Sequence, residues 1–123
     1  MRIKFLKSLL LIEEFSNKKV FQLSGGTKRK LCCAIALLVP PDILLLDEIS
    51  NGVDPVSRKN LYCYLRTLKN TACIMIIHRL DEAEKLCDRV AIMVDGEIRQ
   101  IGDPLTLKER FGLICMLYIT PKV

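Results

Sequence analysis

Two adjacent acids and the chain's only histidine each follow an apolar stretch of this 123-residue sequence. Asp47 and Glu48 come directly after Ile43–Leu46, and His78 comes directly after Ile74–Ile77. Carboxylates that follow a buried strand emerge at the edge where an open α/β sheet binds ligands. Two adjacent acids repel each other, and a divalent cation relieves this repulsion. Taken alone, the acid pair is also typical of a solvated strand end, and a lone histidine is more often structural.

A serine followed by two glycines marks a second candidate site, for an anion. Ser24 can cap a helix that begins at Gly25 and Gly26. A helix start without bulky side chains leaves several backbone N–H groups unpaired, and a phosphate can approach them closely. Apolar residues at helical spacing predict that the helix continues to Pro40, with a face formed by Leu31, Ile35 and Leu38. Alone, this segment is most typical of a glycine-rich turn.

Taken in order, these segments resemble the C-terminal half of an ABC-transporter nucleotide-binding domain, from about Phe21 to Gly112. The corresponding motifs are the signature at Leu23–Thr27, the Walker B strand at Ile43–Glu48, the D-loop at Ser50–Asp54 and the switch histidine at His78. Any one motif would be a weak signal, but four in the correct order and spacing make a strong one.

The resemblance implies a role for each residue of these motifs. Asp47 would help to hold Mg²⁺, Glu48 would polarise the attacking water, and His78 would steady the water and the γ-phosphate of ATP. The signature residues Leu23, Ser24, Gly25 and Gly26 would close over ATP held by a second nucleotide-binding domain. Asp54 would couple the two halves of such a dimer, and the two groups of residues would lie on opposite walls of paired ATP pockets.

Three departures from the family pattern bear on activity. Ile49 stands where proline usually follows the glutamate, which loosens the turn that aims Glu48, and Ile77 replaces a small hydroxyl residue before the histidine. The sequence contains no G-x-x-x-x-G-K-[ST] phosphate loop. The family's adenine-stacking aromatic residue and its Q-loop glutamine also have no counterpart here. We therefore expect no ATP binding and no hydrolysis by this polypeptide alone.

The segments around the motifs resemble the A subfamily, whose members generally move lipids. This resemblance is carried by residues 27–31 at the end of the signature, the Asp54-Pro55 pair, residues 80–87 and residues 107–112. It implies a transmembrane transporter domain as a partner and a location at the cytoplasmic face of a membrane. It also implies that residues 1–22 end a helical subdomain, that 23–112 form the C-terminal half of the ATPase domain, and that 113–123 are a strand or tail.

The pattern of apolar residues predicts an α/β fold, a partial P-loop NTPase domain with a mostly parallel sheet, flanking helices and a C-terminal hairpin. A helix is predicted over 4–15, with Phe5, Leu9, Ile12 and Phe15 on its apolar face. Further helices are predicted from the Asp54 cap to about residue 70, from residue 81, and after residue 104. Strands are predicted at 72–77 and 113–120, with Asp95-Gly96 turning a hairpin between 90–94 and 98–101. The phosphate-loop strand of the family would lie beside 72–77, so we expect an exposed apolar edge there and poor solubility.

Composition narrows the alternatives. The net charge of +5 comes from 19 basic and 14 acidic residues, and Lys28-Arg29-Lys30 is the one basic cluster, too little for a nucleic-acid surface. The six cysteines lie in apolar patterns without ligand spacing, which favours reduced thiols inside the cell. No apolar stretch reaches the roughly 18 residues of a membrane span.

Two other functions fit parts of the sequence. The first is a non-enzymatic chain, or an inactive relic, that docks on a complete ABC domain and caps one nucleotide. The second is an ABC-type ATPase fragment acting on nucleic acid, which the lack of a basic stripe disfavours. A phosphate loop encoded in frame upstream of Met1 would separate a truncated ATPase domain from a docking chain.

Overall fold

The structure, a computed structural model, describes the backbone of residues 1–111 and 116–120. It contains two compact units, each made of segments that are separate in sequence. Unit 1 comprises Met1–Pro41 and Ile49–Lys69, and unit 2 comprises Asp42–Glu48 and Asn70–Val123. The boundaries predicted at residues 22 and 112 stay predictions. The last predicted segment, 113–123, lies partly outside the described residues.

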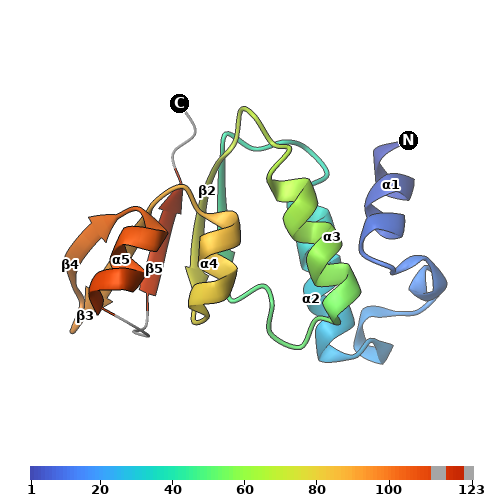
Figure 1. The fold of residues 1–123 in the computed structure, drawn as a ribbon. Coiled ribbons are helices and arrows are strands. Elements are labelled where there is room, and N and C mark those ends of the chain that lie inside the picture. Colours follow the sequence, from blue (N-terminus) through green and yellow to red (C-terminus); the bar gives the residue numbers. More distant parts are fainter. Residues whose placement is uncertain (112–115, 121–123) are drawn as a thin grey trace. The chain divides into compact units, whose positions relative to one another are not determined.

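Unit 1 is helical. Its elements are α1 (Arg2–Leu9), η1 (Glu13–Phe15), η2 (Val20–Gln22), α2 (Gly25–Ala36) and α3 (Pro55–Leu65). Helix α1 packs against α2 and α3 (Figure 1). Two side chains of α3 donate hydrogen bonds to carbonyl oxygens at the end of α1. The Asn60 amide donates to Leu9 at 3.1 Å, and the Ser57 hydroxyl donates to Leu10 at 3.0 Å.

The predicted helix over 4–15 is wrong in extent and in its buried face. Helix α1 ends at Leu9, and Leu11 adopts a left-handed conformation with φ +53°, which breaks the helical repeat. Of the predicted face, Ile12 is buried but Phe5 is 48 % exposed, and Leu6 and Leu10, which lie outside that face, are buried. The buried side of α2 also differs from the predicted one, because Ile35 is exposed while Cys33, Ala34 and Leu37 are buried.

Unit 2 is a five-stranded sheet in the order β1-β2-β5-β3-β4. The strands are β1 (Ile43–Asp47), β2 (Ala72–Ile77), β3 (Val90–Val94), β4 (Glu97–Gly102) and β5 (Met116–Thr120). Helices α4 (Leu80–Leu86) and α5 (Pro104–Phe111) lie on one face of this sheet (Figure 1). The β1–β2 pair is parallel, and the other pairs are antiparallel. The predicted α/β fold and C-terminal hairpin are confirmed. The prediction that the sheet is mostly parallel is wrong for the described strands, because only β1 and β2 run parallel and the three pairs that involve β3, β4 and β5 are antiparallel.

The hairpin follows from its turn residues. Asp95 and Gly96 have φ of +50° and +79°, the pair of left-handed conformations that a two-residue hairpin loop of the primed type requires. A glycine tolerates this backbone without a steric penalty, and aspartate tolerates it better than most residues.

The edge of β2 that was expected to be exposed is paired. Strand β5 lies antiparallel beside β2, with Cys73 opposite Thr120 and Ile77 opposite Met116, and it also pairs with β3. Exposed apolar side chains lie on one face of the β1–β2 pair and not at its edge. On this face Ile43 and Leu45 are 63 % and 71 % exposed. Strand register places Leu45 beside Ile74 and Asp47 beside Ile76 on this face.

Five cysteines of the described residues carry thiols that form no disulfide: Cys32, Cys33, Cys63, Cys73 and Cys87. Burial raises the pKa of the Cys87 thiol to about 12, so this side chain is an uncharged apolar group at neutral pH. None of the described helices has the length and apolar character that crossing a membrane requires.

Candidate functional site

The acidic pair and the histidine meet at the carboxyl ends of β1 and β2. Because these strands are neighbours and parallel, the residues that follow them emerge at the same edge of the sheet. Glu48 donates its backbone N–H to the carbonyl of Ile76 at 3.1 Å, which fastens the end of β1 to β2. The Oε1 atom of Glu48 then contacts Nε2 of His78.

The backbone at Glu48 has an uncommon conformation. Its φ is +44°, in the left-handed region that residues other than glycine seldom adopt. Ile49, which follows it, is buried in unit 1, so the residue that replaces the usual proline contributes to packing. The side chains of His78 and Glu48 remain 54 % and 35 % exposed, which leaves them accessible to a substrate.

Asp47 lies at the last position of β1, on the exposed face. It borders an open, apolar hollow of about 190 Å³ that is otherwise lined by Leu45, Leu46, Ile74 and Ile76. In the part of the chain that the structure describes, no group of three or more histidine, cysteine or acidic residues could hold a metal. One or two carboxylates suit Mg²⁺ that takes its other ligands from phosphate and water, so Asp47 and Glu48 fit such an ion.

The signature segment begins α2 as its residue types predict. The hydroxyl of Ser24 accepts the backbone N–H of Thr27 at 3.2 Å and lies 2.8 Å from the Thr27 hydroxyl. Within the described part of the chain, no hydrogen bond reaches the backbone N–H groups of Gly25 and Gly26. A Cβ at Gly25 would meet nothing within 4 Å, so an anion can approach this helix start closely.

Gly26 has a different surrounding. A Cβ at this position would lie 2.0 Å from the carbonyl oxygen of Gly52, which is backbone and cannot move aside like a flexible side chain. The two glycines of the signature therefore have different roles in the structure. Gly25 keeps the helix start open, and Gly26 allows α2 to touch the D-loop.

Asp54 caps α3, as predicted, and its carboxylate forms hydrogen bonds to other residues of unit 1. One carboxylate oxygen accepts the backbone N–H of Ser57 at 2.8 Å, and the other accepts the ammonium group of Lys30 at 3.0 Å. These interactions, the Ser57 N–H first, hold the pKa of the Asp54 carboxyl well below its ordinary value. One oxygen thus caps α3, and the other joins α3 to α2.

The burial of Lys30 was not predicted from the sequence. Lys30 belongs to the basic cluster Lys28-Arg29-Lys30, but it is only 8 % exposed, whereas Lys28 is on the surface. The available signal was its helical spacing, since Thr27, Lys30, Cys33 and Leu37 share one side of α2 and all are buried. A lysine on the buried side of a helix needs an acid nearby, and the Asp54 cap supplies it.

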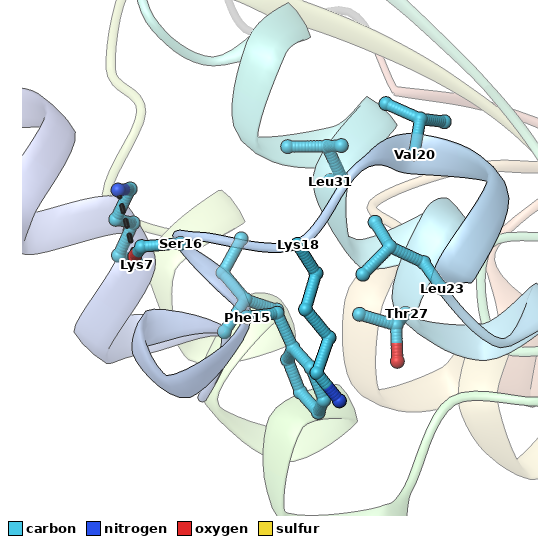
Figure 2. A pocket seen from close by; sticks show the side chains of 9 residues that line it. Lys7, Phe15, Ser16, Lys18, Val20, Leu23, Thr27 and Leu31 are labelled. Atoms are coloured by element: carbon cyan, nitrogen blue, oxygen red, sulfur yellow. Dashed lines mark hydrogen bonds between the residues drawn. The ribbon is translucent and has the colours of Figure 1, made fainter.

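A further hollow lies behind the signature segment. It has a volume of about 190 Å³ and is lined by Lys7, Ile12, Phe15, Ser16, Lys18, Val20, Leu23, Thr27 and Leu31. Figure 2 shows Lys18 beside the ring of Phe15, with its ammonium nitrogen 5.1 Å from the ring centre. The hydrogen bond from Lys7 to Ser16, 2.9 Å long, closes one side. The lining is mainly apolar and does not resemble a phosphate site.

Signature and D-loop belong to unit 1, and Asp47, Glu48 and His78 belong to unit 2. The structure brings residues together within each unit: Gly26 with Gly52, and Glu48 with His78. The prediction that the two groups form opposite walls of paired ATP pockets stays a prediction, as do the roles assigned to Leu23, Ser24 and Asp54.

Comparison with known proteins gives consistent matches. The ABC transporter family matches residues 1–51. ABC transporter A family member 11 of Dictyostelium discoideum is 48 % identical over 111 residues, which cover 89 % of this chain and 13 % of that protein. The human ATP-binding cassette sub-family A member 13 is 45 % identical over 105 residues, covering 84 % of this chain and 2 % of that protein. The chain thus spans a small part of each relative.

Solved structures agree with the sequence relatives. The chain resembles the ATP binding subunit of an ABC transporter with a TM-score of 0.81 and 25 % identity, over 91 % of this chain and 48 % of that subunit. A bacterial ABC exporter with ATP bound gives a TM-score of 0.78 at 25 % identity, over 91 % of this chain and 22 % of that one. The chain therefore belongs to the ABC transporter family, as the C-terminal half of a nucleotide-binding domain most similar to the A subfamily.

Proposed function

We propose that this chain supplies the signature, Walker B, D-loop and histidine surfaces of an ABC ATP-binding domain whose ATP hydrolysis drives transmembrane transport. The observation that carries the proposal is the contact between Glu48 and His78 at the ends of two parallel strands. Residues 30 positions apart converge at the edge where a sheet of this class meets its ligand. Similarity to A-subfamily members supports a lipid as the cargo.

The proposed site residues form two groups that act on two different ATP molecules. Glu48 would orient and polarise the attacking water, and His78 would hold the Glu48 carboxylate and the terminal phosphate in register. Mg²⁺, which Asp47 would help to hold, neutralises phosphate charge when it is bound. Ser24, Gly25 and Gly26 would close over ATP carried by a second nucleotide-binding domain, with their N–H groups directed at its phosphate.

This division predicts that the chain alone neither binds nor hydrolyses ATP, because the phosphate loop that would anchor the nucleotide does not occur in its sequence. Calorimetric titration with Mg·ATP should give no binding heat at micromolar concentrations. A clear micromolar isotherm would overturn the proposed arrangement.

Association with a complete domain tests the signature surface directly. Sedimentation of the chain with an intact A-subfamily nucleotide-binding domain should show a complex that depends on Mg·ATP. Gly25→Asp should abolish this complex, since it adds a negative charge at the anion site where a side chain meets nothing within 4 Å. Asn17→Asp adds the same charge at another exposed position of unit 1 and should leave the complex intact. Equal binding by both variants would refute the signature role.

A further inference from the structure

A buried lysine joins the signature helix to the helix that follows the D-loop. The ammonium nitrogen of Lys30, in α2, lies 3.0 Å from Oδ2 of Asp54 and 3.2 Å from Oγ of Ser57. Lys30 is 8 % exposed and Ser57 is fully buried. Ser57 in turn donates to the Leu10 carbonyl at 3.0 Å, so this polar network reaches the segment after α1. A charge removed from water in this way depends on its partners.

Two further contacts connect the same two segments. The guanidinium group of Arg29 donates to the carbonyl oxygen of Asn51 at 2.7 Å. Gly26 approaches the backbone of Gly52 so closely that a Cβ would collide with it. Three residues of α2 therefore contact the D-loop, each through a different kind of contact. The pairs are Gly26 with Gly52, Arg29 with Asn51, and Lys30 with Asp54.

We propose that Lys30 is a positioning residue that fixes the Ser24–Gly26 turn and the Ser50–Asp54 loop as one rigid body. This inference rests on the proposed function, because the turn and the loop are the surfaces that would meet a second nucleotide-binding domain. Held together, they reach that partner in a fixed relative position, so ATP closure by the turn and contact by the loop occur as one event.

Amide hydrogen exchange of the polypeptide of residues 1–123 tests the coupling without nucleotide or partner. In Lys30→Met, exchange in residues 24–28 and in residues 50–57 should both accelerate, by about tenfold or more, while α1 and the C-terminal half of α2 keep their wild-type rates. Lys30→Arg should restore slow exchange in both segments, because a guanidinium group can also donate to a carboxylate and a hydroxyl. Lys28→Met removes an exposed lysine of the same helix and should change neither segment.

A second variant covers the case in which Lys30→Met does not fold. Asp54→Asn keeps a good helix cap but removes the ion pair, so it should loosen both segments in the same direction and to a smaller degree. Faster exchange confined to one segment, or spread uniformly over unit 1, would overturn the proposal. Because no ATP is involved, this result is independent of whether the chain caps a nucleotide.

Discussion

Glu48 contacts the ring of His78 although the two residues are 30 positions apart. Their proximity follows from the register of the parallel pair, in which Asp47 lies beside Ile76, so that the next residues of both strands leave the sheet together. Both side chains are substantially exposed, and surface pairs of this kind contribute only about 0–1 kcal/mol to stability. The contact therefore contributes little to the stability of the fold.

Glu48→Gln and His78→Ala should separate activity from stability. We expect the free energy of unfolding of the chain to change by less than about 1 kcal/mol in either variant. In a chimera that joins residues 1–123 to the N-terminal half of the nucleotide-binding domain of the Dictyostelium relative, ATP turnover should fall by roughly 10²–10⁴-fold. Steady-state phosphate release measures this loss. Full turnover by the Glu48→Gln chimera would remove Glu48 from the reaction.

The two signature glycines should respond differently to alanine. Gly26→Ala places a Cβ 2.0 Å from the Gly52 carbonyl oxygen, and we expect destabilisation of about 1–3 kcal/mol, typical of overpacking. Gly25→Ala meets nothing within 4 Å and should be neutral or stabilise by up to about 1 kcal/mol. Urea unfolding of the two variants compares them directly. Equal stability of both would contradict the contact between α2 and the D-loop.

Acid should weaken the start of α3. Because the pKa of Asp54 is lowered in the folded chain, its carboxylate stabilises the fold above the unfolded pKa, near 3.9, and this contribution is lost as pH falls toward the folded value. Urea midpoints measured from pH 7 to pH 2 should fall less steeply in Asp54→Asn than in wild type. At pH 7, Asp54→Ala should cost about 1 kcal/mol by loss of the cap. An equal fall of the urea midpoint with pH in wild type and Asp54→Asn would show that the Asp54 carboxylate does not contribute to the pH dependence of stability.

Local signals in the sequence predicted the features that depend on few residues. The helix caps at Ser24 and Asp54 and the turn at Asp95-Gly96 are as expected, because each requires only a short side chain or a permissive backbone at one position. The order of the motifs predicted the family.

Features that depend on distant partners were not predictable in the same way. The burial of Lys30 depends on Asp54, 24 residues away. The left-handed conformation of Leu11, a residue type that seldom adopts it, has no signal in the local sequence. The pairing of β2 with β5 joins residues 39 to 47 positions apart, from Ile77 with Met116 to Cys73 with Thr120, and no local pattern indicates it. Tertiary contacts therefore decided the buried faces, while residue types decided the starts of α2 and α3 and the hairpin turn.

Strand β5 should protect alternate amides of β2. The backbone N–H of Ala72 donates to the Asp42 carbonyl, and the Ile76 carbonyl accepts the Glu48 N–H, so the backbone groups of Ala72 and Ile76 point toward β1. Backbone groups alternate in direction along a strand, so those of Cys73, Met75 and Ile77 point toward β5. A chain that ends at residue 115 should therefore lose amide protection at Cys73, Met75 and Ile77 and retain it at Ile74 and Ile76. The alternation provides an internal control, because global loosening would release all five amides. The unpaired strand edge should also increase self-association, measured by sedimentation velocity. Unchanged exchange at Met75 in the shortened chain would show that β5 does not pair with β2 in solution.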